Sequence, residues 1–468
     1  MKSASSSAAT SRSGGEASRR NASAANARTV FFAQCALATI AYLIFFCSPV
    51  IWISDSVYSM LTAESIIEHG TPDLRAYTIP TFRPEIPAKV RTGHNAYQLG
   101  MANGKALYFF PHGTSILSLP FVAAMKSFGL SPATNDHVFS FSGEVFIQKI
   151  LAAALMAMLA AVFFHTALLM LNLRWSLVIA IGAAFGTQIW STASRSMWSH
   201  TWEIFLAGLV VYLMLRAERR GKGPEPVTFA TVGALLGLMF FVRPQSVVAI
   251  ACVTIYLICT RPRDFVPYAI AGAIGFALYA MYTKAVFGSL IPAYDREPLE
   301  LATFWIKLEK ILVSPSRGLF VYVPAAAFVL YLPARHWKDL QHKPLAIMAL
   351  AAISGFMIII AGFHGYDGLC YGPRLLTDAI PWFVLLAILG CAAIPPERRS
   401  LASSPALGIG ALLLTMSIAI NAGPVAGDGT MGRDGADQRP RDGVVGSSIP
   451  GWAAAWPSSP GDSARVRT

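Results

Sequence analysis

Long apolar runs separated by short polar connections make up residues 30–421. Most of these runs are close to the ~20 residues that a helix needs to cross the hydrocarbon core of a membrane. The pattern therefore predicts an all-α fold, a polytopic transmembrane helical bundle of about eleven spans. We expect the spans at 30–53, 146–172, 175–193, 201–215, 226–242, 245–260, 265–287, 318–333, 344–363, 376–394 and 402–421.

Three polar segments complete the predicted organisation. Residues 1–29, rich in Ser, Ala and Arg, are expected to form a disordered cytoplasmic tail, and residues 422–468 a disordered external tail. Residues 55–143 form a long first external loop with aromatic residues and turn signals. Loops of this length usually carry function or are disordered. We expect amphipathic surface helices within this loop.

Composition and charge support the membrane class. Hydrophobic residues make up 54% of the chain and charged residues only 13%, against about a quarter in soluble domains. The net charge of +12 comes from short basic clusters between apolar runs, not from one patch, which argues against nucleic-acid binding. The clusters fall on alternate connections, and the positive-inside rule then places the N-terminus in the cytoplasm. They are Arg174; Arg216, Arg219, Arg220 and Lys222; Arg261 and Arg263; Arg335, Lys338 and Lys343; Arg398 and Arg399.

Asp55 is the first candidate for chemistry. It stands at the end of the first apolar run, in "WISDSVYSMLTAESIIEHG", which we interpret as a helix along the membrane surface. On such a helix Asp55 shares a polar face with His69, whereas Glu64 and Glu68 lie on the opposite face, so no carboxylate pair forms. Asp55 is thus the preferred catalytic residue. The alternative is a solvated helix-exit or N-cap aspartate.

A second candidate region is "YQLGMANGKALYFFPHGTSILSLPF". Asn103-Gly104 predicts a β-hairpin turn, and the following apolar period predicts a helix capped by Thr114 or Ser115. A helix N-terminus with His112 and Lys105 nearby suggests an anion site. The alternative is a small amphipathic domain whose aromatic residues anchor it at the membrane surface.

The third candidate is a group of basic residues expected at the external boundary. Guanidinium groups suit phosphate and carboxylate ligands, so several at one depth suggest a pocket for an anionic headgroup. The alternatives are snorkelling to outer headgroups or pairing with Asp295, Asp367 or Asp378. The group comprises Arg195 and His200 in "SRSMWSHT", Arg243 in "FVRPQS", Arg317 in "SPSRGLF" and Arg374 in "CYGPRLL".

Other signals narrow the chemistry. Residues 297–312, with Lys307 and Lys310, form an amphipathic stretch expected to connect elements along the outer surface. No GxGxxG after a strand, GxxxxGK[ST] or HExxH motif occurs, so an external site would need a lipid-carried donor. The six cysteines show no CxxC spacing. No ligand spacing demands a metal, although Asp55 with Glu64 or His112 could bind a divalent ion.

Taken in order along the chain, these motifs resemble the GT-C superfamily of polytopic membrane glycosyltransferases. The bacterial branch related to protein mannosyltransferases and lipid A aminoarabinose transferases is the most similar. The resemblance rests on Asp55 after the first span, "GKALYFFPHGTSILSLPF", "SRSMWSHT", "SPSRGLFVYVP" and "GYDGLCYGPRLLTDAIPW" within residues 30–421. Two departures from the family pattern leave the acceptor class open. This chain has Ser54-Asp55-Ser56 where some relatives carry an adjacent Asp-Glu pair, and it has "PHG" where "PPG" is commoner.

The resemblance implies a bundle whose first loop roofs an external cavity at the bacterial inner (plasma) membrane. Such enzymes move a hexosyl or pentosyl group from a polyprenyl-phosphate carrier to a lipid, glycan or protein acceptor. It implies Asp55 as the general base. The implied substrate-binding residues are Arg243, Arg317 and Arg374 as phosphate holders, Lys105, Tyr108 and His112 in the roof, and Arg195, His200 and Tyr371 beside them.

Two other functions remain open. A transporter or flippase of anionic lipids or glycans would need charged residues deep in the spans, at corresponding positions of two repeats. The sequence shows no internal repeats, and it shows no charged residues deep in the spans apart from Arg243 near a boundary. A non-catalytic assembly scaffold would tolerate the loss of both Asp55 and Arg374.

Overall fold

The computed structural model describes residues 7–51, 53–88, 95–221, 223–290, 292, 294, 299–363, 371–395, 397, 399 and 404–426, with side chains from residue 27 to residue 423. Within this part the chain is a bundle of helices with a single two-stranded sheet, which confirms the all-α fold. The described part does not include Lys222, Asp295, Asp367, Arg398, or residues 427–468 of the predicted external tail.

Among the described residues, seven helical segments are long and apolar enough to cross a membrane. They are residues Ala27–Cys47 of α1 (Ser7–Cys47), α4 (Phe141–Leu168), α6 (Ser199–Arg220), α9 (Pro262–Phe287), α13 (Lys343–Gly362), η5 (Arg374–Ala379) continued by α14 (Ile380–Ala393), and residues Pro405–Gly423 of α15 (Pro405–Ala426). The fold is therefore that of a membrane protein.

In the described part of the chain, four shorter apolar helices match the remaining predicted spans. They are α5 (Leu173–Phe185), α7 (Pro226–Val242), the 3-10 turn η3 (Pro244–Ser246) with α8 (Val247–Thr260), and α12 (Ala325–Arg335). Each has fewer than the ~20 residues that a span needs, so the total of about eleven spans stays a prediction.

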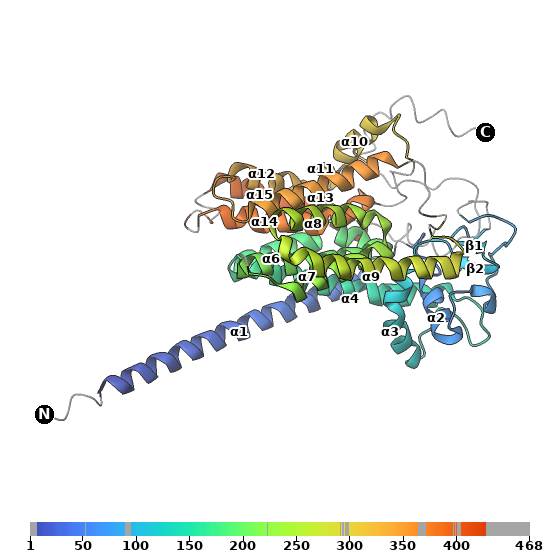
Figure 1. Cartoon of the computed structure of the whole chain (residues 1–468), viewed down its shortest axis with the longest axis horizontal. Helices are drawn as coiled ribbons and strands as arrows, with labels where there is room; N and C mark the ends of the chain where they lie inside the picture. The colour runs from blue at the N-terminus through green and yellow to red at the C-terminus, as the bar shows by residue number, and fades with distance from the viewer. Residues whose placement is uncertain are drawn as a thin grey trace.

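The bundle has two groups of helices (Figure 1). α4, α6, α7 and α9 lie on one side, and α12, α13, α14 and α15 on the other, while α1 extends away from α4. α7 and α9 approach closely because glycines face each other: a Cβ on Gly237 would lie 3.1 Å from the Cα of Gly275. Small residues at such crossings let helix backbones meet in a membrane.

α1 begins at Ser7, so the helix reaches into the segment that we expected to be disordered. Alanine, frequent in this segment, has the highest intrinsic helix propensity. The membrane-spanning part begins only at Ala27.

The first loop folds as a small unit at one end of the bundle, where Figure 1 shows α2 (Ser59–His69), α3 (Gly113–Ser127) and the β1–β2 hairpin together. β1 (Leu99–Ala102) pairs antiparallel with β2 (Lys105–Tyr108). Asn103 and Gly104 have φ of 50° and 71°, as a type I′ turn requires, so the predicted hairpin is confirmed.

Two expectations for the loop are wrong. The N-cap residue of α3 is His112, and neither Thr114 nor Ser115 caps the helix; both lie buried in its first turn. α2 is not a surface helix along its whole length, because residues 59–65 are all buried. Its interior position depends on polar partners from α4, described below.

α10 (Phe304–Val313) begins within the predicted amphipathic stretch 297–312 and ends one residue beyond it. Lys307 and Ile311 are buried on one face, while Trp305 and Ile306 are exposed on the other. Lys307 donates hydrogen bonds to the Glu300 carboxylate and to the carbonyl oxygen of Phe363. The helix is therefore tied to the end of α13, as a connector between spans.

Candidate functional site

Asp55 lies in a turn between α1 and α2, not on a helix. The amide of Val57 donates to the carbonyl of Ser54, and that of Ser59 to the carbonyl of Ser56. Tyr58 then has a left-handed backbone, with φ of 75°, and α2 begins only at Ser59. The expectation that Asp55 shares a helix face with His69 is therefore wrong, because Asp55 precedes the helix and is separated from it by turns and a left-handed residue.

Polar side chains of α4 hold this turn in place. The Glu144 carboxylate accepts the amides of Met60 and Leu61, each at 2.9 Å, and so caps α2 from outside the loop. Gln148, one helical turn further on, donates to the carbonyl oxygen of Ser56 at 2.8 Å and accepts the amide of Met197 at 3.0 Å. The α4 helix thus fixes the Asp55 turn relative to the segment that precedes α6.

The hairpin holds the same turn from the other side. The Tyr108 hydroxyl donates to the backbone carbonyl of Asp55, and the Gln98 amide donates to that of Ser54. Contacts from α4 and from the hairpin therefore fix the position of the turn that carries Asp55. Tyr108 contacts the Asp55 backbone, whereas Lys105 pairs with Ala102 at the opposite end of the hairpin. The roof role of both residues stays a prediction.

The Asp55 carboxylate binds Arg374, the first residue of η5. The terminal nitrogen of Arg374 lies 2.6 Å from Oδ2 of Asp55, and the Tyr97 hydroxyl donates to Oδ1 at 3.0 Å. The guanidinium group lies over the ring of Trp198, with 3.8 Å to its centroid. Its Nε is buried without a partner among the described residues. We call Asp55, Arg374, Tyr97 and Trp198 the boundary pair site.

A second ionic cluster occupies the next turn of η5. The Asp378 carboxylate binds His200 Nδ1 at 2.5 Å through one oxygen and Arg243 Nε at 2.6 Å through the other. Because a carboxylate only accepts, His200 donates from Nδ1, and a neutral imidazole then keeps a lone pair on Nε2. That Nε2 is buried with no partner in the described part of the chain. We call Asp378, His200, Arg243 and the neighbouring Glu203 the buried cluster.

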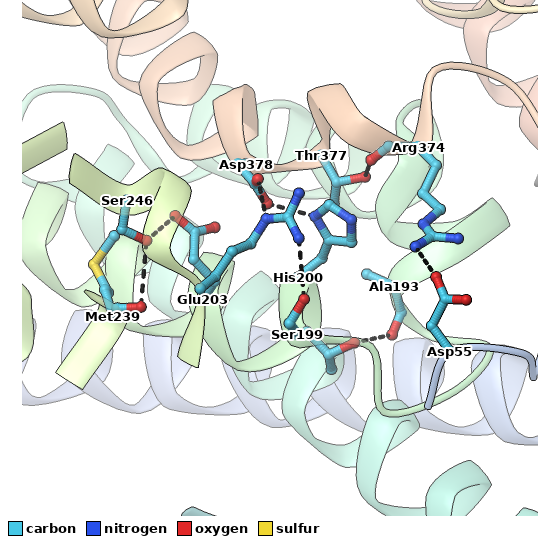
Figure 2. A network of polar contacts seen from close by, with 12 residues as sticks. Asp55, Ala193, Ser199, His200, Glu203, Met239, Ser246, Arg374, Thr377 and Asp378 are labelled. Carbon is cyan, nitrogen blue, oxygen red and sulfur yellow. Dashed lines mark hydrogen bonds and ion pairs between the residues drawn. The ribbon is translucent and has the colours of Figure 1, made fainter. Parts of the chain in front are cut away.

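Figure 2 shows how the two sets are related. Glu203 lies at one side of the network and accepts a hydrogen bond from Ser246 at 3.3 Å, whereas Asp55 and Arg374 lie at the other, with His200 between them. Arg243 was predicted to hold a lipid phosphate; its guanidinium is instead paired with Asp378, one of the alternatives considered from the sequence. His200, also predicted to bind substrate, reaches the same carboxylate.

Arg317 and Arg374 line one pocket. Its other walls come from the apolar side chains of Ile311, Ile360 and Leu375, together with Gly372, Pro373 and Leu376. The cavity volume of ≈ 10 Å³ is about the space of one water. The pocket would therefore have to widen to admit a larger ligand.

His112 is a fully bonded, neutral imidazole. Its Nε2 lies 2.8 Å from the carbonyl of Tyr108 and its Nδ1 lies 2.6 Å from the Tyr282 hydroxyl. Because a carbonyl only accepts, Nε2 carries the proton and Tyr282 donates to Nδ1. Burial lowers the pKa of His112 to about 4. A neutral His112 adds no positive charge, and it hydrogen-bonds the backbone carbonyl of Tyr108; the anion site stays a prediction.

Arg195 and Tyr371 act within the bundle. Arg195 donates to the carbonyls of Trp190 and Phe45, which ties the end of α1 to the π-helix η2 (Ile189–Ala193). The Tyr371 hydroxyl donates to the carbonyl of Ile420, and its ring packs edge-on against Tyr322.

The residues considered for a metal, Asp55 with Glu64 or His112, each have other partners in the described part of the chain. Asp55 binds Arg374 and Tyr97, Glu64 binds Ser131 and Lys126, and His112 binds Tyr108 and Tyr282. These separate partners leave the three side chains in three different environments.

Sequence reasoning missed Glu144, Gln148, Tyr97 and Trp198. For the first two a signal existed: they are polar residues four apart in a predominantly apolar helix, which places both on one face. Tyr97 and Trp198 carry no such signal, because their roles come from contacts with Asp55 and Arg374 across the fold.

No family model matches the chain, and the comparison with curated proteins finds no match either.

Proposed function

We propose that this protein is a membrane glycosyltransferase that moves a sugar from a polyprenyl-phosphate carrier to an acceptor at the external face of the bacterial inner membrane. The observation that carries the proposal is the contact between Asp55 and Arg374 beside a pocket that also contains Arg317. A carboxylate and two guanidinium groups, the residue types that suit proton transfer and anion binding, are thus found near the end of a membrane-spanning segment.

The pocket supports an amphiphilic donor. Guanidinium groups bind phosphate through paired N–H donors, and Arg374 has a buried Nε with no partner in the described structure. The walls formed by Ile311, Ile360 and Leu375 suit a hydrocarbon chain. A phosphate attached to a long apolar chain satisfies both kinds of wall, whereas a free sugar nucleotide would not.

The chemistry follows from the same residues. A bound phosphate competes for Arg374 and releases the Asp55 carboxylate from it. Asp55 then takes the proton of the acceptor hydroxyl as the oxygen forms its bond to the anomeric carbon. The bond between that carbon and the phosphate oxygen breaks, and its electron pair stays on the phosphate. Arg374 and Arg317 stabilise the charge that develops there.

A transporter of anionic lipids or glycans is the second candidate. Ionisable residues inside membrane-spanning segments often mark transport pathways, and the buried cluster of Asp378, His200, Arg243 and Glu203 is of that kind. Proteoliposomes separate the two functions, since a transporter moves the labelled lipid across the bilayer with its sugar intact. A transferase releases the carrier phosphate.

Mass spectrometry of envelope glycolipids tests the proposal in cells. A deletion strain should lack one sugar and accumulate its lipid-linked donor, and wild-type protein should restore the sugar. Asp55→Asn should not restore it at equal protein level, whereas Asp339→Asn, an exposed change in another connection, should. Full restoration by Asp55→Asn would contradict the mechanism.

A further inference from the structure

A cluster of two imidazoles and a carboxylate lies on the first loop, separate from the boundary pair site. Glu68 and His69 end α2, and His137 comes from the segment between α3 and α4. One ligand atom from each of the three lies within 4.8 Å of the others, and all three side chains are exposed. Within the described residues, no other group of three His, Cys, Asp or Glu is arranged in this way.

The backbone around His137 places its imidazole against α2. His137 has φ of 56°, which few residues other than glycine adopt. Its amide donates to the carbonyl of Thr134 at 2.9 Å, and its carbonyl accepts the amide of Thr78 at 2.8 Å. The position of this imidazole is therefore set by the fold of the loop. The His69 and His137 ring centroids lie 6.0 Å apart as a result.

We propose that Glu68, His69 and His137 bind a divalent transition-metal ion of the zinc type. Two imidazoles and one carboxylate form a familiar ligand set for zinc, with water in the fourth position. Imidazole ligands favour zinc, copper or nickel over magnesium and calcium, which prefer oxygen ligands alone. The three ligand atoms lie within 4.8 Å of one another. A small rotation of the side chains would place each of them ~2.0–2.2 Å from a zinc ion between them.

The present partners of Glu68 are compatible with metal binding. The Tyr77 hydroxyl donates to Oε2 at 2.9 Å, an outer hydrogen bond of the type that orients metal-binding carboxylates. Lys126 forms an ion pair with Oε1, and it would have to give way to the metal. It has a second acid within reach, because its Nζ also lies 3.7 Å from Glu64. If the metal displaces Lys126 from Glu68, Glu64 therefore still compensates the charge of Lys126.

The ion would join two parts of the loop that the chain connects only over a long distance. α2 follows the Asp55 turn, and the segment containing His137 leads into α4, which supplies Glu144 to cap α2. A metal there would stabilise the roof of the bundle, whatever reaction the protein performs. This inference is independent of the proposed transferase function.

Zinc binding by the full-length protein in detergent micelles tests the inference. After treatment with a chelator, the protein should bind about one Zn²⁺ per chain in a calorimetric titration with ZnCl₂, and its midpoint of thermal unfolding should rise. MgCl₂ at the same concentration should produce neither effect. Absence of saturable zinc binding to the wild-type chain would overturn the proposal.

Three variants locate the site. His69→Ala and His137→Asn should each lower zinc affinity by tenfold or more, because the loss of an outer hydrogen-bond partner alone already costs ~10–100-fold. Asn tolerates the left-handed backbone, so His137→Asn removes the imidazole without straining the turn. His336→Ala, in the connection after α12, should bind zinc as the wild type does. Unchanged affinity in both loop variants, or a loss in His336→Ala, would overturn the proposal.

Discussion

Two arginine–carboxylate pairs of equal length are built on one short helix. Arg374 and Asp378, both on η5, form ion pairs of 2.6 Å with Asp55 and Arg243. They differ in burial: the side chains of Asp55 and Arg374 keep 20% and 10% of their exposure, whereas Asp378 and Arg243 keep 1% and 4%. We propose that the more exposed Arg374 exchanges Asp55 for a ligand, whereas Asp378 and Arg243 are too deeply buried for either to lose its partner without leaving a charge uncompensated.

The two pairs differ in the role that we propose for them: the Asp378–Arg243 pair stabilises the fold, and the Asp55–Arg374 pair binds a ligand. A buried ion pair contributes little net stability, because the charges lose their hydration, but removing one partner leaves the other buried and unpaired. Asp378 joins η5 to α6 through His200 and to the end of α7 through Arg243. It thereby fixes the short helix from which Arg374 reaches Asp55. The Asp378–Arg243 pair thus supports the Asp55–Arg374 pair.

The largest expected effect is on stability, in Asp378→Ala. Arg243 would be left buried without its carboxylate, which typically costs about 3–5 kcal/mol. The midpoint of thermal unfolding in detergent should fall sharply, while Asp339→Ala at an exposed connection should leave it unchanged. A small effect of Asp378→Ala would show that the buried cluster does not hold η5.

The pH dependence of stability comes next. His112 has a folded-state pKa of about 4, lowered by burial from 6.5, so between these values the unfolded chain binds a proton that the folded chain does not. Stability is therefore lost as pH falls below about 6.5, by up to about 3 kcal/mol at the lower pKa. The difference in unfolding midpoint between pH 7 and pH 5 should shrink in His112→Gln. An equal difference in wild type and variant would contradict the assignment of a neutral imidazole.

Arg374→Lys probes the geometry of the boundary pair site. Lysine keeps the charge but loses the planar fork and the stacking over Trp198. Affinity for a polyprenyl phosphate in micelles should fall by about tenfold, or about 1.4 kcal/mol, with little change in unfolding midpoint. Arg335→Lys, at the exposed end of α12, provides the matched control. Equal affinities for wild type and Arg374→Lys would exclude this guanidinium from phosphate binding.

The smallest effect is expected from Lys105→Gln. Lys105 lies at the turn end of the hairpin, while Tyr108 at the other end contacts Asp55. Transfer activity should stay within about twofold of the wild type, because the half-buried Lys105 lies at the end of the hairpin away from the contact between Tyr108 and Asp55. A tenfold loss would show that the hairpin turn reaches the donor.

The sequence predicts those features of the fold that depend on local signals. Apolar runs placed the long helices, and Asn103-Gly104 placed the hairpin turn, because left-handed backbone there needs these residue types. The burial of α2 could not be predicted locally. Its cap, Glu144, is 84 residues from Met60 along the chain, and only the packing of α4 against the loop brings them together.

For the candidate site, the sequence identified individual residues but not the residues that they contact. Asp55 and Arg374 were both selected, but they are 319 positions apart, and the contact between them comes from the fold. For Arg243, pairing with an acid and phosphate binding were both open, since residue type alone does not choose between Asp378 and a ligand. Tyr97 and Trp198 stayed unnoticed because aromatic residues are common throughout the chain.

Transfer by the purified protein tests the central claim most directly. With a lipid-linked sugar as donor and the acceptor identified from the envelope glycolipids, release of the carrier phosphate can be followed in micelles. Asp55→Asn should lower the rate by about 10²–10⁴-fold, the usual contribution of a general base, while its unfolding midpoint stays close to that of the wild type. A rate equal to that of the wild type would contradict the account.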